Sequence, residues 1–408
     1  HTMPFEMYMP VRLVWGDGAV NADPGRFSQL GSRCLIVTGK HSAISSGALG
    51  DAQRALETAG VAYTLYDGIG QNPLISACHE AGAMARETGA QFILGIGGGS
   101  PLDAAKAVAA YASNPQLEAS DIYKKIFAHA PLPVALIGTT AGTGSEVTAV
   151  SVLTDDATGR KKSISGPAFY AALAFADPKY TYSLDYDFTV STALDAFAHN
   201  IEAWFTPKCG GVLKALAAEG FRLLWPSLTQ LKNTGEVPGE ATRANLYYGS
   251  IYAGMVINNC GTAFPHPVGY ILTENCGVPH GKACAAFLPA FLERARRFAP
   301  DALTEALSIM GEDFDALLQT LRQLTNLPRF GFSREQAEAY AARWQDEPPL
   351  NFKSSPGSLT VAEAAGLGVL RRYRIDPLLQ VGRDGAGPLP ELLGLVGEQP
   401  ADGLGPMS

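Results

Sequence analysis

The stretch QFILGIGGGSPLDAAKA, residues 91–107, joins an apolar run, a glycine-rich turn and a helical segment. The apolar run predicts a buried strand, and Pro101 suits the first turn of the following helix, where its missing N–H would be unpaired anyway. Gly97, Gly98 and Gly99 let backbone N–H groups approach an anion, and a helix N-terminus adds partial positive charge. Ser100 stands where the Rossmann fingerprint needs a third glycine, so an ordinary tight turn is the alternative.

Strands and helices alternate on both sides of this unit. Apolar runs predict strands at 33–38, 61–66, 91–96 and 133–138, and helical patterns that stop at glycines cover 45–59 and 76–88. Strands that alternate with helices indicate a parallel sheet covered on both faces. The sequence therefore predicts an α/β fold for the N-terminal part of the chain.

A second polar turn follows the strand at 133–138. The stretch IGTTAGTGSEVT, residues 137–148, carries the hydroxyls of Thr139, Thr140, Thr143 and Ser145. Two flexible polar turns at the carboxyl ends of strands lie where open α/β sheets bind nucleotides. The alternative is helix capping, with Ser145 before a helix that begins at Glu146.

After about residue 185 helical patterns dominate. They cover 191–205, 212–232, 240–258, 281–298, 300–309, 312–325 and 333–344. We therefore predict three parts: an α/β dinucleotide-binding domain at 1–185, an all-helical domain at 186–374, and a Gly/Pro-rich C-terminal extension at 375–408. The composition of the extension is typical of a mobile tail.

The composition narrows the class of protein. The chain has 408 residues, 47% hydrophobic and 17% charged, with a net charge of −8, so it has no electrostatic footprint for nucleic acid. It has no run of 18 apolar residues and its first residues do not resemble a signal peptide, so we expect no membrane association. Six scattered cysteines without CxxC spacing favour free thiols in a cytoplasmic protein.

One predicted buried helix carries a row of ionisable side chains. In LDAFAHNIEAW, residues 194–204, Asp195, His199 and Glu202 are spaced to share one face of an otherwise apolar helix. A buried carboxylate needs a partner, and a divalent cation would serve. His266 and His280, both in Gly/Pro loops of the helical half, complete a set that suits Fe²⁺ or Zn²⁺. The alternative is a structural pair of Asp195 and His199.

Taken together, these segments resemble the iron-containing (group III) alcohol dehydrogenases of the dehydroquinate-synthase-like superfamily. The resemblance runs from about residue 8 to about residue 371. It is carried by LVWGDGAV, LIVTGK, NP at 72–73, GGGSPLDAAKA, TTAGTGSEVT, ADPKYTYSL, LDAFAHNIEAW and the pair HPVGY and VPHG. It implies a dinucleotide-binding domain and a helical domain, with the active site between them and a homodimer or larger oligomer.

The resemblance also implies roles for individual residues. The implied metal ligands are Asp195, His199, His266 and His280. Independently of the resemblance, the position of Glu202 on the same helix face leads us to expect that it orients a histidine or pairs with a neighbour. The cofactor pyrophosphate is expected on Gly97, Gly98, Gly99 and Ser100, and the ribose and nicotinamide near Asp103, Thr139, Thr140, Thr143 and Ser145. A family lysine near the cofactor corresponds to Lys161, with Lys162 as the alternative.

Two departures from the family pattern concern the cofactor and proton transfer. Gly39 stands where many members have an aspartate that repels a 2′-phosphate, and Lys40 follows it, which favours NADP(H) over NAD(H). Tyr270 replaces a histidine to which a proton-handling role is often assigned. Tyrosine donates a hydrogen bond, but its pKa near 10 makes it a poorer proton shuttle.

The resemblance implies a metal-dependent hydride transfer between NAD(P)(H) and a primary alcohol or aldehyde. The main alternative is a dehydroquinate-synthase-like lyase that uses NAD and a metal on a sugar phosphate. Such a lyase needs several basic residues for its acidic substrate, and the helical half shows no obvious basic cluster.

Overall fold

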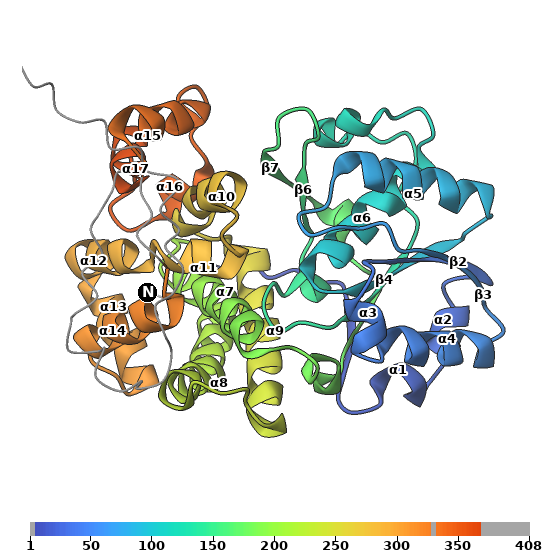
Figure 1. Cartoon of the computed structure of the whole chain (residues 1–408), viewed down its shortest axis with the longest axis horizontal. Coiled ribbons are helices and arrows are strands. Elements are labelled where there is room, and N and C mark those ends of the chain that lie inside the picture. Colours follow the sequence, from blue (N-terminus) through green and yellow to red (C-terminus); the bar gives the residue numbers. More distant parts are fainter. Residues whose placement is uncertain (1–4, 328–331, 369–408) are drawn as a thin grey trace, which may run out of the picture. The chain divides into compact units, whose positions relative to one another are not determined.

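In the described part of the chain, six parallel strands form the sheet of the N-terminal half, in the order β1–β8–β5–β4–β2–β3. Strands β2, β3 and β4 of this sheet are labelled in Figure 1. Their bounds are β1 Arg12–Trp15, β2 Arg33–Thr38, β3 Ala62–Tyr66, β4 Phe92–Gly97, β5 Val134–Gly138 and β8 Leu173–Ala176. The computed structural model describes residues 5–327 and 332–368, and the predicted extension at 375–408 lies outside them.

Helices cover both faces of this sheet, as the sequence predicts. Leu35 and Val37 of β2 pack with α5 and α6 on one face, and Cys34 and Ile36 face α1 to α4 on the other. Alternate residues of one strand thus enter two different cores, which explains the continuous apolar runs. The bounds are α1 Ala19–Ala22, α2 Gly25–Ser28, α3 Ser42–Ser45, α4 Ala48–Thr58, α5 Ile75–Glu87 and α6 Gly99–Ser113.

Some elements differ from the prediction. The helix expected at 45–59 is divided at Gly47, whose φ of 84° interrupts helical geometry. The edge strand β1, the inner strand β8 and an antiparallel hairpin of β6 (Val150–Thr154) and β7 (Lys161–Ser165) were not predicted. β1 and β8 have only four residues each, too few to show a period.

The second polar turn does not lead into an α-helix. A short 3₁₀ turn, η2 (Ser145–Val147), follows Gly144, whose φ is 63°. Ser145 is therefore inside the turn and caps no α-helix, so the capping interpretation of Ser145 is wrong. Further 3₁₀ turns are η1 Ala119–Lys124, η3 Pro167–Phe169 and η4 Pro178–Thr181.

From Tyr186 onward the described chain is helical. Its elements are α7 Tyr186–Trp204, α8 Val212–Thr234, α9 Glu240–Cys260, α10 Pro265–Cys276, α11 His280–Ala285, α12 Leu288–Phe298, α13 Pro300–Met310, α14 Phe314–Thr325, α15 Arg334–Ala341, η5 Ala342–Trp344, α16 Leu350–Ser354 and α17 Val361–Gly368. None of the described helices is long and apolar enough to cross a membrane. The parallel sheet followed by helices confirms the predicted fold class.

Helix α10 replaces a predicted loop. Pro265 and Pro267 suggested irregular backbone, but they occupy the first and third positions of the helix. N–H groups in the first turn have no partner within a helix, so proline costs little there. Both loop assignments for the candidate ligands are therefore wrong, because His266 lies on α10 and His280 begins α11.

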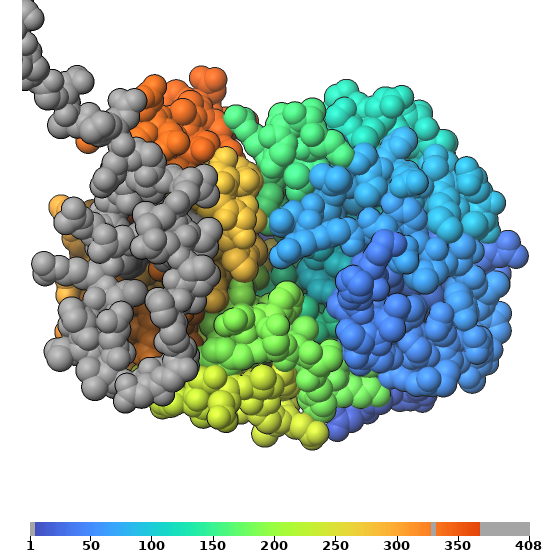
Figure 2. Space-filling model, in the orientation of Figure 1, coloured from blue at the N-terminus to red at the C-terminus, as the bar shows by residue number. Residues whose placement is uncertain are grey.

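The two halves of the described chain pack against each other. Helix α7 packs against α8, α9 and α11 within the helical half. The turn at Gly144 meets Gly254 of α9 so closely that a Cβ on either glycine would lie less than 3.0 Å from the other residue. In the space-filling view the β6–β7 region borders α10 along the seam between the halves (Figure 2). The seam places the polar turns next to the helices that carry the histidines.

Candidate active site

Asp195, His199 and Glu202 lie on one buried face of α7. Their spacing of four and three residues puts them on the same side of the helix, as the sequence predicts. The exposed fraction is 3% for Asp195, 6% for His199 and 0% for Glu202. Charged side chains are almost never fully buried unless they are paired, so the partners of these three residues indicate the function of this helix face.

Three imidazoles converge on Asp195. Its Oδ1 lies 3.6 Å from Nε2 of His199, 3.5 Å from Nε2 of His266 and 3.5 Å from Nε2 of His280. These distances are longer than good hydrogen bonds. Oδ1 of Asp195 and Nε2 of His266 are buried and have no hydrogen-bond partner among the described residues. The structure thus brings together all four side chains that the sequence nominated as ligands.

A cysteine completes the cluster, and sequence reasoning missed it. The potential ligand atoms of Asp195, His266, His280 and Cys284 all lie within 4.8 Å of one another. His199 lies beside this group and stacks its ring on that of His266, with centroids 4.5 Å apart. Cys284 follows His280 by four residues, and that helical spacing was the signal available in the sequence.

Glu202 holds the ring of His266 in one orientation. Nδ1–H of His266 donates to Oε2 of Glu202 over 2.7 Å, and Oε1 accepts from the backbone N–H of Ala263. Because a carboxylate only accepts, Nδ1 of His266 carries a proton, and Nε2 on the other side of the ring faces Asp195. The expectation that Glu202 orients a histidine thus agrees with this geometry.

Burial keeps the imidazoles of His199 and His280 neutral. It lowers the pKa of His199 to about 4, even though Asp195 opposes that effect, and it also lowers the pKa of His280. Burial alone would raise the pKa of Asp195, but the surrounding imidazoles together hold it below its usual value. At neutral pH the face therefore presents an anionic Asp195 and the neutral imidazoles of His199 and His280, which are metal-ligand forms. Burial alone would lower the pKa of His266, but its acidic neighbours, Cys284 and Glu202 first, raise it.

Gly281 allows helix α11 to come this close to α7. A Cβ at this position would collide with the carbonyl oxygen of Ser191 and would lie 3.1 Å from Cβ of Asp195. The glycine that follows His280 in the sequence therefore sets the distance between His280 and Asp195. Its role is steric, because its φ is not in the left-handed region.

The two polar turns predicted to bind a nucleotide lie side by side. A Cβ on Gly98 would meet Thr140 at 3.0 Å, and a Cβ on Gly99 would overlap the side chain of Thr143. The backbone N–H of Thr139 donates to the carbonyl of Gly97 over 2.9 Å. The second turn also packs on helix α7, where a Cβ on Gly142 would lie 3.0 Å from Thr192. The turns thus adjoin the helix that carries Asp195.

A buried lysine joins helix α6, which follows the glycine turn, to the second turn, and it was absent from the sequence prediction. Nζ of Lys106 donates to Oγ of Ser145 over 2.9 Å and to the carbonyls of Thr148 and Val150 over 2.9 and 2.8 Å. Burial lowers the pKa of Lys106 to about 8. A lysine in the apolar stretch of α6 was the sequence signal.

Asp103 reinforces the same link. Its carboxylate accepts from Oγ of Ser145 over 2.6 Å and from the backbone N–H of Val152 over 2.9 Å. Oδ1 also lies 3.9 Å from Nζ of Lys106. Asp103 and Ser145, both predicted near the cofactor, therefore bond to each other and fix the shape of the second turn.

Lys161 connects the glycine turn to the histidine cluster. Its Nζ donates to Oδ1 of Asn72 over 3.0 Å, and the N–H of Asn72 donates to Oγ of Ser100 over 3.2 Å. The same Nζ lies 5.2 Å from the ring centroid of Tyr270, which lies 5.6 Å from that of His280.

The alternative lysine points elsewhere. Nζ of Lys162 lies 4.9 Å from the ring centroid of Tyr123, in the sheet half. The structure thus places Lys161 beside the site residues, and burial lowers its pKa.

Gly39 and Lys40 follow β2, as predicted. Nζ of Lys40 is exposed and forms an ion pair with Asp67 over 3.1 Å. A Cβ on Gly39 would lie 3.0 Å from the carbonyl oxygen of Ile69. Position 39 itself has no carboxylate, but Asp67 supplies one to the adjacent Lys40, a pairing that the sequence did not reveal.

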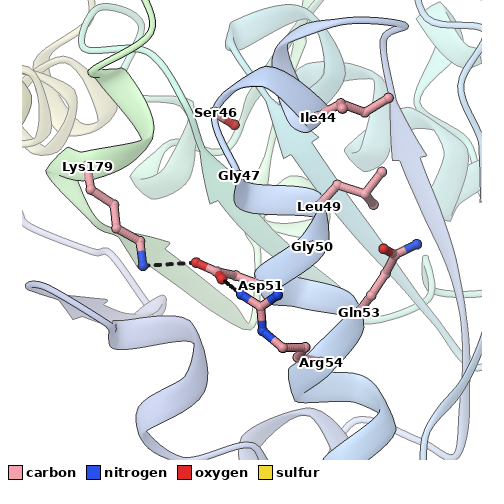
Figure 3. A pocket seen from close by; sticks show the side chains of 9 residues that line it. All are labelled: Ile44, Ser46, Gly47, Leu49, Gly50, Asp51, Gln53, Arg54 and Lys179. Carbon is pink, nitrogen blue, oxygen red and sulfur yellow. Dashed lines mark hydrogen bonds and ion pairs between the residues drawn. The ribbon is translucent and has the colours of Figure 1, made fainter.

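A surface pocket of about 480 Å³ lies beside α3 and α4 (Figure 3). Oδ2 of Asp51 forms an ion pair with Nζ of Lys179 over 2.9 Å, and Asp51 also forms an ion pair with Arg54. None of the nine residues that line the pocket belongs to the histidine cluster or to the glycine turn. We therefore regard Asp51 and its partners as a structural ion network between α4 and η4.

Two family models match the chain. The model described as iron-containing alcohol dehydrogenase matches residues 10–178, and the C-terminal model of the Fe-containing alcohol dehydrogenase family matches residues 189–347. The chain is 34% identical to a long-chain primary alcohol dehydrogenase of Thermoanaerobacter ethanolicus, over 67% of this chain and 69% of that protein. It is 30% identical to a sulfoacetaldehyde reductase of Bilophila wadsworthia, over 84% and 92% respectively.

Solved structures agree with this result. An iron-containing alcohol dehydrogenase of Thermotoga maritima superposes with a TM-score of 0.82 at 32% identity, covering 89% of this chain and 98% of that one. A sulfoacetaldehyde reductase of Bifidobacterium kashiwanohense, solved with NAD⁺, superposes with a TM-score of 0.78 at 25% identity, covering 90% and 98%. The chain with its Asp195-centred histidine cluster therefore belongs to the iron-containing alcohol dehydrogenase family.

Proposed function

We propose that this oxidoreductase transfers a hydride between a primary alcohol or aldehyde and a nicotinamide dinucleotide at the seam between its halves. The observation that supports it most directly is the convergence of three imidazole nitrogens on Oδ1 of Asp195 at 3.5–3.6 Å. Both family models describe alcohol dehydrogenases, which favours hydride transfer over the lyase reaction.

The cluster fits a divalent cation held by Asp195, His199, His266 and His280. Donor atoms about 2.0–2.1 Å from one shared ion would lie roughly 3–3.4 Å from one another, slightly less than the distances around Asp195. The unpartnered Oδ1 of Asp195 and Nε2 of His266 are the buried polar atoms that such an ion would satisfy. One carboxylate and three imidazoles suit Fe²⁺ or Zn²⁺. The cation, when bound, supplies Lewis acidity toward the alcohol or carbonyl oxygen.

The adjacent turns provide the dinucleotide site in this proposal. Backbone N–H groups of Gly97, Gly98, Gly99 and Ser100 would hold the pyrophosphate at the start of α6, where the helix dipole favours an anion. Thr139, Thr140 and Thr143 line the neighbouring turn, and Asp103, Ser145 and Lys106 keep it in place. Lys161 reaches from β7 toward the same region through its contact with Asn72.

Tyr270 is proposed to contact the substrate as a hydrogen-bond donor. Burial raises the pKa of its phenol, so the hydroxyl stays protonated at neutral pH. The ammonium of Lys161 over its ring holds the side chain beside His280. A neutral phenol can orient an alcohol or aldehyde oxygen but does not exchange protons readily at this pH.

NADP(H) is the proposed preference between the two dinucleotides. An exposed ion pair such as that of Lys40 with Asp67 is worth only about 0–1 kcal/mol, so a doubly charged 2′-phosphate can displace the carboxylate from Lys40. Gly39 places no carboxylate against the adenosine ribose. The solved sulfoacetaldehyde reductase structure contains NAD⁺, so the test below compares NADPH with NADH.

Small alcohols and aldehydes are the proposed substrates. The curated relatives are named long-chain primary alcohol dehydrogenase, sulfoacetaldehyde reductase, 1,3-propanediol dehydrogenase and lactaldehyde reductase. We further propose a cytoplasmic enzyme that forms a homodimer or larger oligomer. All six cysteines are free, as expected in a reducing compartment.

The direct test is an assay of reduced nicotinamide absorbance with purified protein. The metal-stripped protein is reloaded with Fe²⁺, Zn²⁺ or Ni²⁺ and mixed with short aldehydes and either NADPH or NADH. We expect metal-dependent oxidation of the cofactor, faster with NADPH at equal subsaturating concentrations. Turnover that is equally fast in stripped and reloaded protein would falsify the metal assignment, and no turnover with any pair would reject the proposed reaction.

A further inference from the structure

Cys284 places a thiol inside the cluster of candidate metal ligands. Its Sγ lies 3.7 Å from Nδ1 and 3.8 Å from Nε2 of His280, and its side chain is fully buried. The ligand atoms of Asp195, His266, His280 and Cys284 lie within 4.8 Å of one another. The sulfur is therefore close enough to the carboxylate and imidazole donors to share one ion with them.

Two unpartnered atoms point to an ion in this same group. Oδ1 of Asp195 and Nε2 of His266 are buried, lie 3.5 Å apart and have no hydrogen-bond partner among the residues of the described chain. A native core satisfies nearly all of its buried polar atoms. A cation bound between the carboxylate, the imidazole and the sulfur would satisfy both atoms at once.

The backbone is built to hold the sulfur at this place. Cys284 follows His280 by four residues on α11, so both side chains extend from the same face of the helix. Helix α10 approaches α11 at Gly269, where a Cβ would lie 3.0 Å from Cα and N of Cys284. This close approach brings Cys284 of α11 and His266 of α10 to the same point.

We infer that Cys284 is a thiolate ligand of the metal ion, in addition to the carboxylate and imidazoles, and that it biases the site toward borderline-soft cations. The inference rests on the proposed metal site. On binding, the S–H bond breaks, its proton passes to solvent and a sulfur–metal bond forms, with no change in oxidation state. Thiolate favours Zn²⁺ and Co²⁺ over the harder Mn²⁺ and Mg²⁺.

Charge balance supports a second anion next to the ion. A divalent cation and the ammonium of Lys161, whose Nζ lies 5.2 Å from the ring centroid of Tyr270 beside His280, carry three positive charges. The carboxylates of Asp195 and Glu202 supply two negative charges, and a thiolate at Cys284 supplies the third. A buried site costs least when its total charge is zero.

X-ray absorption of zinc-loaded protein tests the bond directly. Zinc–sulfur distances are about 2.3 Å and zinc–nitrogen distances about 2.0–2.1 Å, so one sulfur ligand is resolved from imidazole and carboxylate. We expect one sulfur neighbour in the wild type and none in Cys284→Ser, which keeps nearly the same volume. Cys276→Ser, which changes the exposed cysteine at the end of α10, is the matched control and should keep the sulfur neighbour.

Metal selectivity gives a second measurement. In competition between Zn²⁺ and Mn²⁺, Cys284→Ser should reduce the preference for zinc by about tenfold or more, because the lost ligand is the soft one. Circular dichroism and thermal unfolding verify that the variant is folded. If Cys284→Ser does not fold, the absorption spectrum of the wild type alone still decides the presence of sulfur, and Cys284→Ala provides a second variant.

The outcomes separate this inference from the proposed function. Suppose that the wild type binds one zinc per chain with only nitrogen and oxygen neighbours, and that Asp195→Ala loses this zinc. That result would overturn the role of Cys284 and leave the proposed metal site intact. Zinc that stays bound in Asp195→Ala would reject the metal site itself, and the inference with it. A sulfur neighbour that persists in Cys284→Ser would also overturn the inference.

Discussion

The ammonium of Lys161 lies over the phenol ring of Tyr270, with Nζ 5.2 Å from the ring centroid. Lys161 belongs to the β6–β7 hairpin of the sheet half, and Tyr270 belongs to α10 of the helical half. Glu274 strengthens the same link, because it accepts from the backbone N–H of Lys161 and pairs with Arg343. The contact fixes the β6–β7 hairpin of the sheet half relative to the helix that carries His266.

Replacing Tyr270 with phenylalanine should separate the two roles of this side chain. The ring that contacts Lys161 remains, and only the hydroxyl is lost. We expect kcat/KM for aldehyde reduction to fall about tenfold, which corresponds to one hydrogen bond of about 1–1.5 kcal/mol, with metal content unchanged. An unchanged kcat/KM in both reaction directions would show that the hydroxyl does not touch the substrate.

Asp195→Ala should remove the metal. The variant loses the one carboxylate on which the three imidazoles converge, so metal affinity should fall by more than about 100-fold. Elemental analysis after dialysis, together with circular dichroism, measures the loss in a folded protein. Glu202→Gln is the graded control: it keeps a hydrogen-bond partner for His266 and should weaken metal binding only about 10–100-fold. Full metal content in Asp195→Ala contradicts the assignment.

Cofactor choice should depend on Lys40 and Asp67. Lys40→Ala should lower kcat/KM for NADPH about tenfold and leave that for NADH nearly unchanged, because a charge-assisted contact to the 2′-phosphate contributes about 1.5–3 kcal/mol. Asp67→Asn should shift the preference the opposite way by freeing Lys40.

Gly39→Asp is the complementary change. It should weaken NADPH more than NADH, because it places a carboxylate where the 2′-phosphate would lie. Its Cβ must also displace the carbonyl of Ile69 by a few tenths of an ångström, so Gly39→Ala controls for that steric effect. Equal losses for both cofactors in Gly39→Asp would reject the proposed preference.

Lys106 should make stability depend on pH in the alkaline range. Its pKa is lowered to about 8 by burial, whereas an unfolded lysine has a pKa of about 10.4. Between these values the unfolded state binds more protons, so the free energy of unfolding contributed by Lys106 rises with pH. Denaturant unfolding at pH 8 and pH 10 should therefore show the wild type gaining about 2 kcal/mol relative to Lys106→Met. A constant difference between the two proteins would exclude this effect.

Gly281→Ala should disturb the cluster without touching a donor atom. The new methyl group must push α11 away from the carbonyl of Ser191. We expect a loss of stability of about 1–3 kcal/mol and weaker metal binding, since His280 begins the displaced helix. Gly277→Ala is the control. Gly277 has a left-handed backbone conformation, and an added Cβ would contact nothing within 4 Å, so this variant should lose stability but bind metal normally.

The sequence by itself was sufficient for the elements whose signals are local. Short apolar runs predicted β2 to β5, and helical patterns predicted α5, α7, α8 and α9. The spacing of Asp195, His199 and Glu202 placed them on one face before any tertiary contact was considered. The two polar turns could also be predicted from the sequence, because a turn that follows a strand is specified by neighbouring residues.

Tertiary structure decided the features that depend on distant segments. β1 and β8 are four residues long; β1 acquires its place by pairing with β8 across about 160 residues of chain, and β8 lies between β1 and β5. The sequence assigned no role to Lys106, Asn72 or Cys284. Their roles come from contacts with Ser145, Lys161 and His266, respectively. A periodic pattern reports what a residue's own helix or strand buries, whereas a site is made where separate elements meet, and no local pattern specifies that meeting.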